Sequence, residues 1–225
     1  MTTAKIAGRT VAALLLAQML VSPIVNFVLL LPNFKPPGFL EQAPVHATTI
    51  GIAALLGIGA GALSVAIAIA AWPVFRRHGE TIALALFAAG IASLVANVVE
   101  QSHLLSMLSL AKTYAAANGA DADVFRRIGA HAAAARYTAH LIGLVGGGAF
   151  AFVFYGASFR FALVPRWLAG LGMIAALLEI VAVSLPFFGE PIVFVLLAPL
   201  GLCHLALMIW LFVRGFAEHP AAPAG

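Results

Sequence analysis

Residues 48–75 read TTIGIAALLGIGAGALSVAIAIAAWPVF, a run without a charged side chain that ends at Arg76-Arg77-His78-Gly79. A membrane-spanning helix needs about 20 consecutive, predominantly apolar residues. The run therefore predicts a spanning helix. The basic residues directly after it are typical of a loop at the membrane surface.

The whole chain shares this composition. Of its 225 residues, 63% are hydrophobic and 9% are charged, and the mean hydropathy is +1.07. Soluble domains carry about 25% charged residues, so this chain has too few charges to cover a water-facing surface. The composition excludes a soluble enzyme, a disordered chain and a coiled coil.

Five further apolar runs lie on either side of residues 48–75. The sequence predicts an all-α membrane protein, a bundle of six transmembrane helices in one domain over residues 1–216, with a disordered C-terminal tail over residues 217–225. Pro23 is expected to kink the first span. The third run is longer than a bilayer requires, so it should tilt or project into water. The predicted spans are 8–31, 48–75, 81–114, 127–157, 167–187 and 192–214.

Basic residues set the expected orientation, N-in and C-in. Seven of them fall on the side of the termini and four on the opposite side, which favours a cytoplasmic location for both termini. Because the +4 net charge sits at the ends of apolar runs, we expect no nucleic-acid partner. The seven are Lys5, Arg9, Arg76, Arg77, Arg160, Arg166 and Arg214, and the four are Lys35, Lys112, Arg126 and Arg127.

Two pairs of glycines have the spacing that lets helix backbones approach closely. Gly57 and Gly61 are four residues apart, as are Gly143 and Gly147. This small-xxx-small pattern predicts that the second and fourth spans are tightly packed. The single cysteine, Cys203, forms no internal disulfide and is expected to be a small buried side chain.

Several polar side chains fall inside the predicted spans, where an ionisable group costs at least about 2.5–3.5 kcal/mol. A helical rise of about 1.5 Å per residue places most of them between the bilayer centre and the outer interface. His204 lies deeper and should stand apart. The residues that we expect to bind a ligand are Glu100, Arg136, His140, Glu179, Asn97 and Asn26.

A buried cation requires an acidic partner. We therefore predict an ion pair between Arg136 and Glu100, with Glu179 as the second candidate acid. The alternative is that the charged groups of the third and fourth spans meet lipid headgroups and water at the outer interface.

Metal and haem sites remain open from the residues alone, so the cofactor is unknown. Glu100 and His103 form an E-x-x-H motif on one helical face, and with His140 they would supply the three ligands that zinc needs. His103 and His140 could also face each other as axial haem ligands. No serine, cysteine or aspartate accompanies a histidine in a catalytic triad.

Three stretches carry a resemblance to a known family. They are Ala4-Lys5-Ile6-Ala7-Gly8, Leu163-Val164-Pro165-Arg166-Trp167-Leu168-Ala169-Gly170 and Leu207-Met208-Ile209-Trp210-Leu211-Phe212-Val213-Arg214-Gly215. With them the chain resembles the DUF4386 family of bacterial integral membrane proteins, whose function is unknown. The resemblance implies a small multi-helix protein of the bacterial cytoplasmic (inner) membrane and supplies no catalytic residues. The intramembrane polar residues depart from a typical member, which carries fewer charges there.

Three functions remain open at this stage. The first is a binding or transport-like protein whose outer-half pocket holds a small ligand, an ion or a lipid headgroup. The second is a membrane redox protein or enzyme that uses haem, quinone or metal. The third is an accessory subunit in which the polar groups only join helices. Membrane lipids are the expected partners, and an oligomer is possible.

Overall fold

The computed structural model describes residues 2–117 and 121–218. Within these ranges the chain is helical and contains no strand. The elements are α1 (Thr3–Pro23), η1 (Ile24–Leu30), η2 (Leu31–Phe34), α2 (Phe39–Gln42), α3 (Ala47–Phe75), α4 (Glu80–Ala116), α5 (Ala122–Arg160), α6 (Arg166–Ser184), η3 (Leu185–Phe188), η4 (Phe194–Leu196) and α7 (Ala198–Val213).

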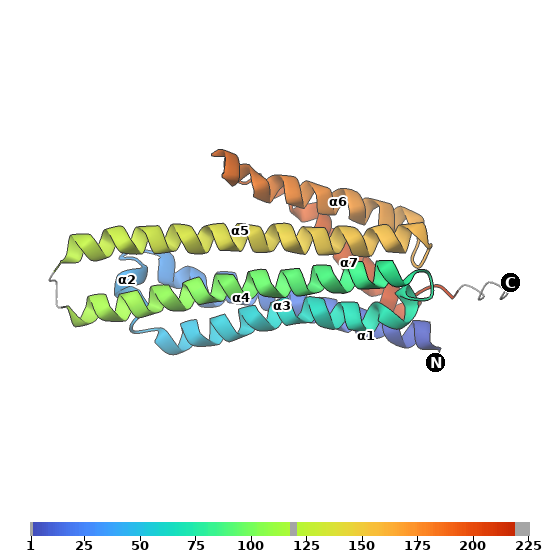
Figure 1. Ribbon diagram of the computed structural model, residues 1–225, viewed down its shortest axis with the longest axis horizontal. Coiled ribbons are helices and arrows are strands. Elements are labelled where there is room, and N and C mark those ends of the chain that lie inside the picture. The colour runs from blue at the N-terminus through green and yellow to red at the C-terminus, as the bar shows by residue number, and fades with distance from the viewer. Residues whose placement is uncertain (1, 118–120, 219–225) are drawn as a thin grey trace.

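Six helical segments in the described part of the chain are long and apolar enough to cross a membrane. They confirm the predicted multi-pass, all-α architecture, and their ends differ from the predicted ones by a few residues. Figure 1 shows the N- and C-terminal segments at the same end of the bundle. This arrangement agrees with an even number of crossings, while the N-in/C-in orientation itself stays a prediction.

Pro23 changes the type of the first helix rather than ending the span. The α-helix stops at Pro23 and continues as the π-helix η1 and then the 3-10 helix η2. Proline lacks the N–H needed for the regular ladder, and a switch to another helical hydrogen-bond pattern accommodates that loss. The short helix α2, which the sequence pattern did not reveal, follows η2.

Helices α4 and α5 are much longer than the membrane requires. They contain 37 and 39 residues, and 37 residues span roughly 55 Å at 1.5 Å per residue. The hydrocarbon core is about 30 Å thick. Figure 1 shows both helices extending beyond α3 and α6 at the end opposite the termini. Both helices therefore extend past the neighbouring spans, and whether they tilt in the bilayer or project into water stays a prediction.

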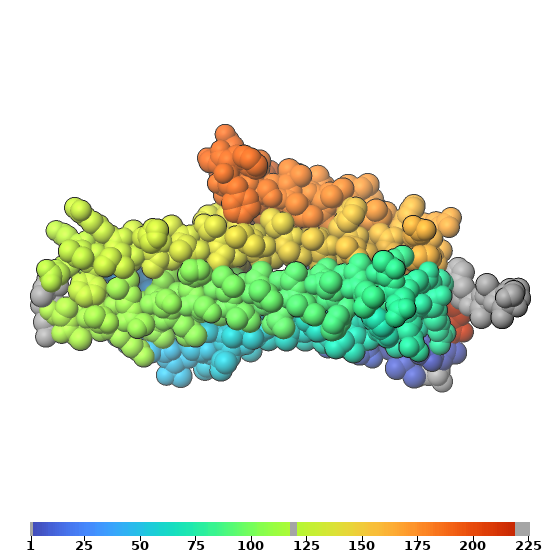
Figure 2. All heavy atoms as spheres, viewed as in Figure 1, coloured from blue at the N-terminus to red at the C-terminus, as the bar shows by residue number. Residues whose placement is uncertain are grey.

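Buried apolar side chains form two separate clusters along the bundle. One cluster lies at the end of the termini and joins α1, α3, α4, α5, α6 and α7. The other joins η1, α2, α3 and α4 toward the opposite end. The last turn of α6 and η3 stand out from the bundle surface, well short of the far ends of α4 and α5 (Figures 1 and 2), and Phe188 in η3 is 81% exposed.

Close packing at the predicted glycine pair is confirmed on α3, whereas α5 packs closely at Gly148, where an added methyl group would lie 2.7 Å from Ile180, and not at the predicted pair. A methyl group added at Gly57 would lie 2.6 Å from the Gln101 side chain, and one at Gly61 would lie 2.9 Å from Asn97. On α5 the same test finds only Ala96 at 4.0 Å from Gly143 and nothing within 4 Å of Gly147. The prediction for this second pair is wrong, because these glycines face open space instead of a neighbouring backbone.

The first residue of the predicted tail, Ala217, is part of the described fold. The backbone N–H of Ala217 donates to the carbonyl of Leu163 over 2.8 Å, and Phe216 is 3% exposed. Residues 217 and 218 therefore continue the described fold, and Ala217 is held by α5's C-terminal loop. The rest of the predicted tail, residues 219–225, lies outside the described residues.

The positive-inside pattern predicts that both termini are cytoplasmic. A fluorescent protein that matures only in the cytoplasm, fused after Gly225, should therefore fluoresce. A fusion in the α4–α5 connection should remain dark. Fluorescence from the second fusion and not the first would reverse the orientation.

Tight contact between α5 and α6 predicts that Gly172→Ala destabilises the bundle. The added methyl group would overlap the ring of Tyr155, which is fully buried. Overpacking costs about 1–3 kcal/mol, which should lower the thermal unfolding midpoint in detergent. Gly201→Ala is the matched control, because its methyl group meets nothing within 4 Å. Equal midpoints for the two variants would contradict this packing.

Candidate intramembrane cavity

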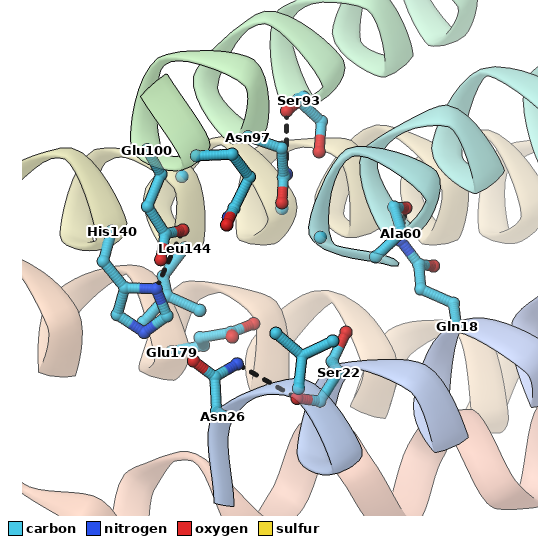
Figure 3. Close-up of a pocket in the computed structure, with 15 residues that line it drawn as sticks. Gln18, Ser22, Asn26, Ala60, Ser93, Asn97, Glu100, His140, Leu144 and Glu179 are labelled. Atoms are coloured by element: carbon cyan, nitrogen blue, oxygen red, sulfur yellow. Dashed lines mark hydrogen bonds and ion pairs between the residues drawn. The ribbon is translucent and has the colours of Figure 1, made fainter. Parts of the chain in front are cut away.

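A polar cavity separates the two apolar clusters. Its volume is about 150 Å³, and its wall is formed by α1, η1, α3, α4, α5 and α6. The cavity lies beside the second half of the first span and the first half of α3. Along these two helices it is therefore nearer to the end opposite the termini. The lining residues are Gln18, Ser22, Val25, Asn26, Gly57, Ala60, Ser93, Asn97, Glu100, Gln101, His140, Gly143, Leu144, Gly147 and Glu179 (Figure 3).

Glu100 is the centre of the charged network. Arg136 Nη2 donates to Glu100 Oε1 over 2.9 Å, and His140 Nδ1 donates to Glu100 Oε2 over 3.1 Å. The Glu100 side chain is only 8% exposed and that of Arg136 13%. Both carboxylate oxygens thus accept a bond from α5, which confirms the ion pair predicted from the sequence.

The Arg136 guanidinium has a second neighbour that the sequence did not suggest. Its central carbon lies 5.4 Å from the centroid of the Phe34 ring, within the range of a cation–π interaction. Phe34 reaches this position because η2 follows η1 at the end of the first span. Arg136 therefore joins three segments that are distant in sequence: the first span, α4 and α5.

Five of the six residues expected at a ligand site line the cavity, namely Asn26, Asn97, Glu100, His140 and Glu179. Arg136 lies behind the wall and reaches it through Glu100. Glu179 does not pair with Arg136, and among the described residues its carboxylate has no ion-pair or hydrogen-bond partner. The alternative of separate charges at the outer interface does not describe this arrangement, since η1, α4, α5 and α6 bring these groups together.

The asparagine amides are oriented by their own helices. Asn97 Nδ2 donates to the Ser93 carbonyl over 2.9 Å, and Asn26 Nδ2 donates to the Ser22 carbonyl over 3.0 Å (Figure 3). Each bond uses an amide N–H and leaves the Oδ1 oxygen without a hydrogen bond. The cavity wall therefore offers amide oxygens as acceptors.

Gln101 is a buried amide next to these groups. Its side chain packs on Gly57 and the residue is 2% exposed, while its Oε1 oxygen has no hydrogen-bond partner. A buried polar atom without a partner costs about 1–3 kcal/mol. Gln101 is therefore a polar group at the cavity whose bonding capacity the described side chains do not use.

Small residues create the space, and this feature was missed in the sequence. Gly143 and Gly147 form part of the α5 wall, and the absence of side chains at these positions leaves volume next to Glu100 and His140. Gln18 and Ser64 form hydrogen bonds at the other end of the cavity. Gln18 Nε2 donates to Ser64 Oγ over 2.9 Å and to the Ala60 carbonyl over 3.2 Å. Ser22 and Ser93 were also missed, because serine is common in spanning helices.

The metal alternative lacks a matching geometry. Within residues 2–117 and 121–218, no group of three histidine, cysteine, aspartate or glutamate side chains is placed to hold a metal ion. His103 is absent from the cavity wall. His204 stands apart as expected, on α7 beside the Tyr155 ring with centroids 5.7 Å apart.

Comparison with known protein families identifies the family of this chain. The family model described as a domain of unknown function, DUF4386, matches residues 8–215. The chain belongs to the DUF4386 family. The match covers every residue of the cavity wall and every candidate span except residues 3–7 of the first one, and it confirms the resemblance carried by the sequence stretches. No curated protein and no solved structure matches the chain.

In this DUF4386 protein, breaking the buried ion pair of Glu100 should lower the stability much more than breaking an exposed ion pair. Arg136→Gln should lower stability by about 3–5 kcal/mol, because it leaves a buried carboxylate without its cation. The double variant Glu100→Gln with Arg136→Gln should recover part of this loss. Thermal or denaturant unfolding in detergent measures the cycle.

Arg126→Gln is the control on the same helix. Its partner is Asp123 at 3.2 Å, and the two side chains are 60% and 89% exposed, so its removal should change stability little. If Arg136→Gln were as harmless as Arg126→Gln, the buried pair would not contribute to the fold.

Proposed function

We propose that this protein is a binding or transport-like protein of the bacterial cytoplasmic membrane, with both termini cytoplasmic, whose intramembrane cavity binds a small polar ligand in the outer half of the bilayer. One observation carries the proposal: a polar cavity of about 150 Å³ lies inside an otherwise apolar bundle. Polar groups inside a membrane are costly. A purely structural role would be met by direct bonds between helices and would need no space between them.

The distribution of polar contacts supports a ligand-binding role over a role in which the polar groups only connect helices. The Glu100 network does join α4 to α5, and Gln18 joins α1 to α3. Glu179 lines the cavity without a partner among the described side chains, and the buried Oε1 oxygen of Gln101 has no partner either. Groups that serve only to join helices would be expected to bond to one another, so these two favour a ligand.

A single substitution in the cavity wall should fill the cavity. Gly147 lines the cavity, and a side chain added there meets nothing within 4 Å. Gly147→Leu should therefore occupy the cavity without overlapping a neighbouring helix. Gly59→Leu is the matched control, because Gly59 is exposed on α3 and also has no atom within 4 Å of an added methyl group.

A ligand that binds the folded state raises its stability by about 1.4 kcal/mol at ten times the dissociation constant. We expect at least one solute among sodium chloride, methylammonium chloride, choline acetate, choline phosphate and acetamide to raise the unfolding midpoint of the wild-type protein in a choline chloride buffer. The same solute should stabilise Gly59→Leu and not Gly147→Leu. A panel without any effect that depends on Gly147 would contradict the proposed function.

A further inference from the structure

The charges of the cavity wall leave one acid without a counter-charge. Glu100 is neutralised by Arg136 at 2.9 Å. Glu179 lines the same cavity from α6, and no described basic side chain lies within ion-pair distance of it. An ionised Glu179 would thus give the cavity a net negative charge, which favours a positively charged occupant.

The wall also contains neutral amides with free acceptors. Each of the Asn26 and Asn97 amides uses one of its two N–H groups on a backbone carbonyl, and its Oδ1 oxygen makes no hydrogen bond. The amides therefore keep acceptors as well as donors, and the preference for a cation rests on the Glu179 carboxylate.

Gln101 is a second unpaired polar group beside the cavity. The residue is 2% exposed and belongs to the wall, and its Oε1 oxygen has no hydrogen-bond partner. Gly57 leaves room for this side chain, so its burial is part of the α3–α4 packing. The oxygen is closed off from the cavity space, so the Gln101 side chain would have to rotate to contact an occupant.

The size of the cavity limits the occupant. About 150 Å³ is smaller than the roughly 300–1,000 Å³ of sites for drug-sized molecules. It corresponds to only a few water molecules at about 30 Å³ each. A hydrated monovalent ion or a group of a few atoms fits this space, whereas a haem does not.

Resting on the proposed function, we propose that the cavity binds a small monovalent cation, either an alkali-metal ion or a primary ammonium group. The Glu179 carboxylate supplies the negative charge. The amide oxygens of Asn26 and Asn97 supply the remaining contacts. Glu100 and Arg136 act as positioning residues, because their pairing holds α4 against α5 and keeps Arg136 from competing with the cation for Glu179.

The test compares cations of equal charge on the purified full-length protein in detergent at constant ionic strength. Sodium, potassium and methylammonium chloride are each exchanged against tetramethylammonium chloride, which is larger and has no N–H donor. The unfolding midpoint of the wild-type protein should rise with at least one of the three. Stabilisation by methylammonium alone identifies an amine or an amine-bearing headgroup, and stabilisation by sodium or potassium identifies a metal ion.

Glu179→Gln should weaken the apparent affinity for that cation by roughly tenfold or more, the factor for losing a charge-assisted contact. Glu190→Gln is the matched control, since Glu190 is exposed in the α6–α7 connection. If Glu179→Gln is unstable, Glu179→Asp keeps the charge and should retain cation-dependent stabilisation, whereas Gly147→Leu should abolish it.

The outcomes separate this inference from the proposed function. Stabilisation by acetate, phosphate or acetamide that Gly147→Leu abolishes would overturn the cation and leave ligand binding intact. An unchanged cation response in Glu179→Gln would also overturn it. If no solute gave a stabilisation that Gly147→Leu abolishes, both the cation inference and the proposed ligand-binding function would be overturned.

Discussion

The contact between Glu100 and the two basic side chains of α5 is the constraint around which the bundle is arranged. A carboxylate at this depth needs a counter-charge and hydrogen-bond donors, and α5 supplies both through Arg136 and His140. The two residues are one helical turn apart, so they can reach one carboxylate only if α5 presents that face to α4. The pairing therefore determines the rotation of the two longest helices relative to each other.

A polar layer between two apolar clusters follows from this arrangement. The cluster at the termini holds all six spans together, and the opposite cluster closes the bundle around α2. Neither cluster extends through the middle, where glycine and polar side chains replace large apolar ones. Gly143 and Gly147 leave the space, and the amides of Asn26 and Asn97 direct their oxygens to it. The functional proposals rest on this combination of space and unused acceptors.

Much of the architecture was accessible from the sequence, because hydrocarbon imposes a simple rule on each helix separately. The six spans, the excessive length of residues 81–114 and the packing of Gly57 and Gly61 were predicted and are present. The ion pair of Arg136 with Glu100 was also predicted, since a buried cation requires an acid and only two were available. The close packing predicted at Gly143 and Gly147 was wrong, because spacing alone does not distinguish a glycine that contacts a helix from one that borders a cavity.

By itself, the sequence determined that this chain crosses a membrane several times and that a few ionisable groups must find partners there. Both conclusions follow from the cost of exposing polar groups to hydrocarbon, which depends on composition and not on shape. Tertiary structure decided which acid accepts Arg136 and which remains alone. It placed Phe34 against Arg136 and Gln101 against Gly57, and it left a cavity between the clusters. These features depend on how separate helices are rotated and spaced against one another, and no local pattern along a single helix encodes that relation.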